Sequence, residues 1–208
     1  NLESLELGTH NLLKHVDNLK NKLGLNVIVA INKFVDDSDK EIALLQQKLE
    51  EQGINLSLVE AWEYGGKGAA DLATKIVELT NNETTVNYAY ELEDSIKTKI
   101  EKIAKNIYGA EGVEYSEEAE EEIAKIEKLG CSNFPVCMAK TQYSFSDDPT
   151  NLVCDKPFTI HVKEIRLKTG AEFIVVLTGK IFTMPGLPKV PAAESIDIDE
   201  EGNIVGIF

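Results

Sequence analysis

The chain has 208 residues, of which 43% are hydrophobic and 27% are charged, and its formal net charge at pH 7 is −15. This length predicts one large domain or two small ones, and the composition excludes disordered, collagen-like and disulfide-stapled chains. No apolar run reaches the ~18 residues of a membrane span, and the acidic excess disfavours nucleic acid and anionic membranes as partners.

The negative charge is concentrated in two stretches. Residues 111–127 contain eight glutamates and one lysine, and residues 194–201 contain five acids and no base. We expect the first stretch to form a solvated helix face and the second a hairpin, so the rest of the chain carries little net charge.

The N-terminal residues predict a helix followed by a buried strand. Leu12, Val16 and Leu19 recur at helical spacing, and Gly24 is placed to end that helix. The run Asn26-Val27-Ile28-Val29-Ala30-Ile31 is rich in β-branched residues and does not alternate, which predicts a strand that is buried on both faces, as in a parallel sheet.

The following segment repeats this order. The pair Ser38 and Glu41 has the spacing of a capping box and predicts the start of a helix. A strand over 54–59 and a helix over 72–79 follow, separated by a glycine-rich loop over 65–68. The order strand, helix, strand, helix is typical of half of a doubly wound α/β sheet.

Residues after the polar Asn-Asn-Glu-Thr-Thr stretch predict a second domain. Two helices are expected first, and strands follow. Alternation over 158–167 slips phase once, which predicts a β-bulge, and strands over 173–177 and 196–207 complete an antiparallel set. We therefore expect a parallel-sheet α/β half-domain over 1–83 and an α+β domain with antiparallel strands over 84–208.

The spacing of cysteines and histidines assigns no catalytic residue and no metal site. The cysteines, Cys131, Cys137 and Cys154, are an odd number with no CxxC pair, which is typical of reduced thiols in a cytosolic protein. None of the three histidines has a Ser or Cys partner at the spacing of a nucleophilic triad. His161 alternates with core positions on a strand and is expected to face solvent.

Two aromatic residues stand at the predicted ends of neighbouring strands. Phe34 follows the first strand and Trp62 follows the second. Ligands of open α/β sheets bind outside the carboxyl ends of the strands, so this pair is a candidate for stacking a flat ring. Alternatively, Phe34 packs under the next helix and Trp62 belongs to the core. The glycines at 65–68 do not form GxxxxGK[ST] and are a weak phosphate-loop candidate.

Several long stretches are similar to formate–tetrahydrofolate ligases. They include Val29-Ala30-Ile31-Asn32 with Phe34, the decapeptide 140–149 (KTQYSFSDDP), the run 173–189 and Pro191-Ala192-Ala193-Glu194. The stretches occur in the family's order and cover almost the whole chain. On this resemblance the chain is identified as a member of that family.

The resemblance implies an enzyme that uses ATP to join formate to N10 of tetrahydrofolate through formyl phosphate. It implies that Phe34 and Trp62 sandwich the pterin ring and that Leu58 lines the same pocket. It also implies that a loop closes near the active site, formed by Met184, Pro185, Gly186 and Leu187. Phe34 and Trp62 would orient the attacking amine, and no residue of the chain is assigned as a catalytic acid or base.

The family's phosphate loop has no match here, because GxxxxGK[ST] does not occur in the sequence. The resemblance therefore implies a C-terminal portion of the ligase, with residues 1–83 as the remnant of a P-loop NTPase-like domain, and we expect the chain alone to be inactive. It also implies Mg²⁺ with ATP, a monovalent cation, small-molecule substrates, a cytoplasmic location and a homotetramer of the full-length protein. Val35, Tyr64 and Lys67 depart from the family's pattern near the predicted pterin pocket.

Two other functions stay open. A non-catalytic folate-binding or subunit-association module would keep the pterin pocket without the reaction. A GTPase-type domain is suggested by Asn32-Lys33, but guanine recognition needs Asn-Lys-x-Asp, and Val35 stands at the aspartate position. The acidic stretches lie far in sequence from Phe34 and Trp62, so the net charge does not exclude an anionic folate.

Overall fold

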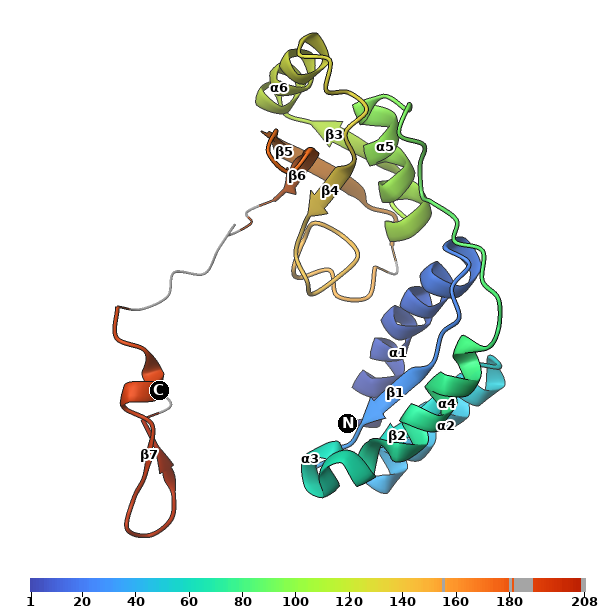
Figure 1. Ribbon diagram of the computed structural model, residues 1–208, viewed down its shortest axis with the longest axis vertical. Coiled ribbons are helices and arrows are strands. Elements are labelled where there is room, and N and C mark those ends of the chain that lie inside the picture. The colour runs from blue at the N-terminus through green and yellow to red at the C-terminus, as the bar shows by residue number, and fades with distance from the viewer. Residues whose placement is uncertain (155, 180, 182–188, 207–208) are drawn as a thin grey trace.

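The computed structural model of the protein describes residues 1–154, 156–179, 181 and 189–206 (Figure 1). These residues form an N-terminal α/β unit, a second unit around a four-stranded sheet, and a C-terminal hairpin that stands away from both in Figure 1. No helix of the described residues is long and apolar enough to cross a membrane.

The N-terminal unit contains the predicted alternation of strands and helices. Its elements are α1 (Leu2–Asp17), the π-helical turn η1 (Asn18–Lys22), β1 (Val29–Asn32), α2 (Asp39–Glu51), β2 (Leu56–Val59), α3 (Ala61–Tyr64), the 3₁₀ turn η2 (Gly65–Ala69) and α4 (Ala70–Thr80). Strands β1 and β2 pair in parallel and form a two-stranded sheet. The predicted parallel sheet is therefore confirmed, and the residues expected to form a glycine loop form a 3₁₀ turn instead.

One face of this sheet is covered and the other is half open. Val29 and Ile31 of β1 pack with Val16 of α1 and Leu49 of α2 in one hydrophobic cluster. Helix α4 packs on β2 from the opposite face, where Ser57 Oγ donates to Asp71 Oδ2 over 2.6 Å. The prediction that the first strand is buried on both faces is wrong, because α4 covers β2 and leaves alternate residues of β1 exposed.

The second unit is built around a mixed sheet with the strand order β3-β5-β6-β4. Its elements are α5 (Ile96–Lys102), the π-helical turn η3 (Ile103–Tyr108), β3 (Gly112–Tyr115), α6 (Glu117–Lys128), β4 (Val136–Ala139), β5 (Thr159–Lys168) and β6 (Phe173–Thr178). The predicted antiparallel pair is β5 and β6, and the register slips between Val162 and Glu164, which confirms the expected bulge. Strands β3 and β4, which no sequence pattern indicated, add parallel pairs at the two edges.

The core of this unit contains a lysine among isoleucines and valines. Ile96 and Ile100 of α5 and Ile126 of α6 are fully buried against the sheet. Lys99 is also fully buried, and its Nζ donates to the carbonyl oxygens of Ser132 at 2.7 Å and Phe134 at 3.0 Å. This ammonium group therefore ties α5 to the segment that leads into β4, and burial lowers its pKa.

Polar contacts join the two units. Asn18 Nδ2 donates to Ile107 O over 2.8 Å, and Asn11 Nδ2 donates to Leu152 O over 2.7 Å. The rings of His15 and Phe145 lie with centroids 4.6 Å apart. The hydrophobic clusters of the two units share no residue. The chain passes from one unit to the other through the polar stretch that was predicted as a boundary, and the division into 1–83 and 84–208 stays a prediction.

The C-terminal hairpin pairs β7 (Asp197–Ile198) with β8 (Ile204–Val205), as the sequence predicted. A short 3₁₀ turn, η4 (Ala192–Glu194), precedes it. The Asp199 carboxylate closes the turn by accepting hydrogen bonds from the backbone and side chain of Asn203. The hairpin therefore contains one of the two acidic stretches, and α6 with β3 contains the other.

Candidate functional site

The parallel register of β1 and β2 brings two strand ends to the same level. Asn32 pairs with Val59, and the N–H of Lys33 continues the ladder by donating to Val59 O over 2.9 Å. The residues that follow, Phe34 after β1 and Trp62 in α3 after β2, therefore leave the sheet side by side. This is the edge at which open α/β sheets bind ligands.

The Phe34 side chain is held out of the core by the turn that carries it. The Phe34 N–H donates to Asp37 Oδ2 over 2.8 Å, and the Asp37 N–H returns a bond to Phe34 O over 3.1 Å. The turn then runs directly into the Ser38 capping box of α2. Phe34 is 51% exposed, so the alternative that it packs under the next helix is excluded.

The Trp62 side chain is more exposed still, at 68%, which excludes the alternative of a core tryptophan. Its short helix is fixed by the 3₁₀ turn behind it. The Glu60 N–H donates to Gly68 O over 3.0 Å, and a Cβ at Gly68 would lie 2.3 Å from Glu60 O. Only glycine permits this approach of two backbones. The glycine-rich segment thus fixes the start of the helix that carries Trp62, a role that its sequence did not indicate.

Phe34 and Trp62 line one cavity of about 330 Å³ at this edge. Its remaining lining residues are Lys33, Val35, Glu60 and Glu63. A volume of this order suits a small ring system, since ligand pockets span roughly 300–1,000 Å³. The structure therefore brings together the two aromatic residues that the sequence singled out.

The polar groups of this aromatic cavity are paired across the two strand ends. Lys33 Nζ donates to Glu60 Oε1 over 3.2 Å, and both side chains are about one-third exposed. The hydrogen bond and charge of Glu60 raise the pKa of Lys33. The hydrogen bond and charge of Glu63 raise the pKa of the Tyr64 hydroxyl in the same way. Sequence inspection missed the Lys33–Glu60 pair, because it depends on the register of the two strands.

Two further predicted site positions lie elsewhere. Leu58 sits on β2 one row before the strand end and packs against the cluster of Val29 and Ile31. It is absent from the described residues that line the aromatic cavity. The loop residues Met184, Pro185, Gly186 and Leu187 lie outside the described residues.

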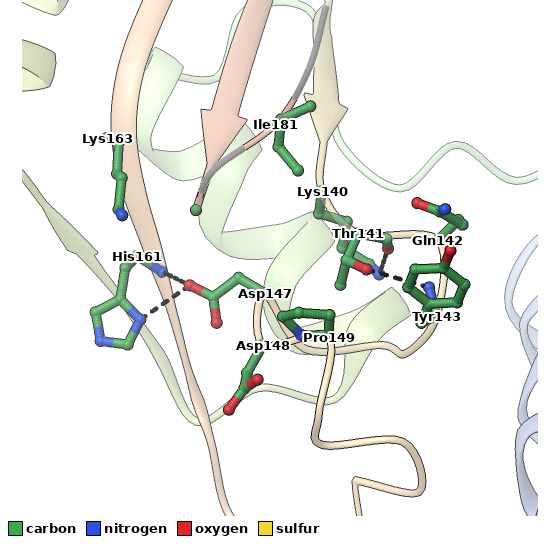
Figure 2. A pocket seen from close by; sticks show the side chains of 11 residues that line it. Lys140, Thr141, Gln142, Tyr143, Asp147, Asp148, Pro149, His161, Lys163 and Ile181 are labelled. Carbon is green, nitrogen blue, oxygen red and sulfur yellow. Dashed lines mark hydrogen bonds and ion pairs between the residues drawn. The ribbon is translucent and has the colours of Figure 1, made fainter. Parts of the chain in front are cut away.

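A second and larger cavity, of about 920 Å³, lies on the second unit and is shown in Figure 2. One side of it is the decapeptide 140–149, which the resemblance had singled out without a role. His161 and Lys163 of β5 line the other side (Figure 2), and Gly179 and Ile181 complete the described lining.

The decapeptide is stiffened by hydrogen bonds within itself. The hydroxyls of Ser144 and Ser146 are buried and donate to Asp148 O over 3.1 and 3.0 Å. Lys140 Nζ donates to Thr141 O over 2.8 Å and to Ser144 O. Burial lowers the pKa of Lys140. Lys140 therefore lines the cavity while its ammonium group is bound to carbonyl groups of the decapeptide.

The decapeptide is fastened to β5 through Asp147. Its Oδ2 accepts the His161 N–H over 2.8 Å and lies 2.9 Å from Nδ1 of the same residue (Figure 2). Asp147 is nearly buried, whereas the His161 side chain is 54% exposed, which confirms that it faces solvent. No Ser or Cys is among the described residues lining this cavity, so the pair is not part of a Ser- or Cys-based nucleophilic triad there.

Comparison with known proteins assigns the family. The family model described as formate–tetrahydrofolate ligase matches residues 1–208. The chain belongs to the formate–tetrahydrofolate ligase family. Membership implies a ligase whose substrates are small molecules, ATP and tetrahydrofolate among them, and it confirms the resemblance seen in the sequence. Among the described residues no cluster of His, Cys, Asp and Glu could hold a metal ion.

Proposed function

We propose that the aromatic cavity binds the pterin ring of tetrahydrofolate and that this chain is the C-terminal portion of the ligase that formylates its N10 atom. In that reaction formate, ATP and tetrahydrofolate yield 10-formyltetrahydrofolate, ADP and phosphate. One observation supports the proposal above all. Two largely exposed aromatic side chains, from the ends of adjacent parallel strands, line one cavity in a chain of this family.

Stacking explains why these two side chains are exposed. Phe34 and Trp62 leave apolar ring surface in water, which is unfavourable unless another group covers it. A flat heterocycle between them would contribute about 1–3 kcal/mol per stacked face. Binding of this kind would hold the folate amine in a fixed orientation for attack on an activated formyl group.

We assign this chain the acceptor side of the reaction. The sequence lacks GxxxxGK[ST], the loop whose backbone amides bind nucleotide phosphates. ATP with its Mg²⁺ and a monovalent cation would then be bound by other parts of a complete, homotetrameric ligase. No described residue is given the role of catalytic acid or base.

The stacking site can be tested with the chain itself, because Trp62 is its only tryptophan. Tetrahydrofolate should quench its fluorescence, and Phe34→Ala should weaken binding roughly 5- to 100-fold. Tyr88→Ala is a matched control, since this aromatic residue is 83% exposed and does not line the cavity. Unchanged affinity of the Phe34 variant, or an equal loss in both variants, would contradict the stacking site.

A second candidate is a non-catalytic folate-binding or subunit-association module, which the missing phosphate loop favours. The two candidates differ in what a complete ligase would need from this chain. Replacing Phe34 and Trp62 by alanine in a complete ligase should abolish formylation if the aromatic cavity is the acceptor site of the reaction. The same replacement should leave formylation intact if the chain is a non-catalytic module. Formation of 10-formyltetrahydrofolate by the purified 208-residue chain would contradict both.

A further inference from the structure

Glu60 is anchored at the aromatic cavity through both its backbone and its carboxylate. Its residue's N–H donates to Gly68 O over 3.0 Å, and its carbonyl accepts the Tyr64 N–H over 2.9 Å. Its Oε1 accepts Lys33 Nζ over 3.2 Å. A glutamate on a surface ordinarily samples many rotamers, and ordering it costs conformational entropy. Here the backbone bonds fix the Cα position, and the ion pair with Lys33 favours one direction of the carboxylate before any ligand binds.

Glu60 also keeps unused hydrogen-bonding capacity. Among the described residues only Lys33 donates to its carboxylate, so Oε2 is unpaired and Oε1 has a second lone pair. The other carboxylate of the cavity, Glu63, has no ion-pair partner among the described residues that would fix its direction. Glu60 is therefore the acceptor in this cavity that is both positioned and available.

The two aromatic faces restrict what can reach this acceptor. A ring stacked between Phe34 and Trp62 presents its edge, rather than its face, to the groups around it. The cavity contains two carboxylates and one ammonium group, so a ring edge that carries hydrogen-bond donors is favoured over an anionic edge. The pyrimidine half of a pterin has two such donors side by side, the N3–H and the 2-amino group.

We propose that Glu60 accepts these two hydrogen bonds and so selects a 2-amino-4-oxo ring over rings that lack the donors. This inference rests on the proposed pterin site and adds the residue that determines its specificity. Lys33 is the positioning residue: it neutralises part of the charge of Glu60 and sets the direction of the carboxylate. Charge-assisted hydrogen bonds of this kind are shorter and stronger than those between neutral groups.

The test compares two ligands on three proteins. Tetrahydrofolate and its 2-desamino analogue are titrated into the purified chain by calorimetry and by Trp62 fluorescence. The proteins are the unchanged chain, Glu60→Gln, and Glu63→Gln as the matched control from the same cavity. Circular dichroism establishes that each variant is folded.

We expect the unchanged chain to prefer tetrahydrofolate roughly 10- to 100-fold over the analogue, and Glu63→Gln to keep this preference. Glu60→Gln should bind both ligands equally weakly. A Glu60 variant that retains the preference overturns the assignment while leaving the stacking site intact. Absence of tetrahydrofolate binding by the unchanged chain overturns the stacking site itself, and the role of Glu60 with it.

Discussion

Gly68 shows how one residue away from the ligand can determine the shape of the aromatic cavity. A Cβ at this position would meet Glu60 O at 2.3 Å, Glu60 C at 2.5 Å and Ala61 N at 2.9 Å. These are backbone atoms, so the collision can be relieved only by moving the start of α3. Such a shift would displace both Glu60 and Trp62.

We therefore predict that Gly68→Ala weakens tetrahydrofolate binding at least 10-fold, since a shift of this size disrupts both stacking and the Lys33–Glu60 pair. Gly66→Ala is the matched control, because a Cβ there meets nothing within 4 Å. Calorimetric titration of both variants measures the difference. Equal affinities for the two would show that the contact between Gly68 and Glu60 does not position the site.

The sequence predicted part of this site and missed the rest for identifiable reasons. Phe34 and Trp62 could be found because strand ends in a parallel sheet share one edge, a rule that needs only the order of elements. The pairing of Lys33 with Glu60 and the approach of Gly68 to Glu60 depend on register and on the path of a 3₁₀ turn. Neither can be derived from residue spacing.

At the scale of elements, α2 begins where its capping box predicted. Ser38 Oγ accepts from the Glu41 N–H, and the Glu41 carboxylate accepts from the Ser38 N–H over 3.1 Å. The hydrogen bonds that the hydroxyl and the backbone N–H of Ser38 donate to this carboxylate lower the pKa of Glu41.

This pKa gives a pH dependence with a definite sign. Because the folded pKa of Glu41 is lowered below its ordinary value of 4.5, ionised Glu41 stabilises the fold fully above pH 4.5, and this contribution is lost as the pH falls through the folded pKa. Glu41→Gln should therefore lower the free energy of unfolding at pH 6 and have little further effect at pH 2. Urea unfolding at the two pH values measures this, with Ser38→Ala expected to show a smaller change. A deficit of Glu41→Gln that is constant with pH would contradict the assignment.

The elements missed in the second unit are those that depend on distant partners. Strands β3 and β4 each have four residues and pair in parallel with β5 and β6, far along the chain. Short strands of this kind have no local turn or alternation to indicate them. The burial of Lys99 could not be predicted either, because a lysine on a helix ordinarily faces solvent. The carbonyl groups that bind its ammonium group come from residues 132 and 134, more than 30 positions along the chain.

At the scale of the whole molecule, two hydrophobic cores are joined by polar contacts. Leu49 belongs to the cluster of the first unit and Ile126 to that of the second. The contacts between units include the side-chain amides of Asn11 and Asn18. Interfaces of this polarity are typical of domains that keep separate stabilities.

We predict two calorimetric unfolding transitions. Leu49→Ala and Ile126→Ala each remove a fully buried side chain, at a cost of about 2–5 kcal/mol, and should lower the midpoint of different transitions. Each variant is the control for the other. A single transition that both substitutions shift equally would show one cooperative unit and would argue against the division near residue 83.

The two-stranded sheet of the N-terminal unit has a consequence for how ligand binding changes local stability. Strands β1 and β2 share one ladder, and a two-stranded sheet is only marginally stable by itself. A pterin held between Phe34 and Trp62 would clasp the ends of the two strands and oppose their separation. The Lys33 amide, which closes the ladder on Val59 O, should then exchange its hydrogen up to ~100-fold more slowly at saturating tetrahydrofolate. The slowing of exchange at Lys33 would then report the same free energy of ligand binding that a titration measures as affinity.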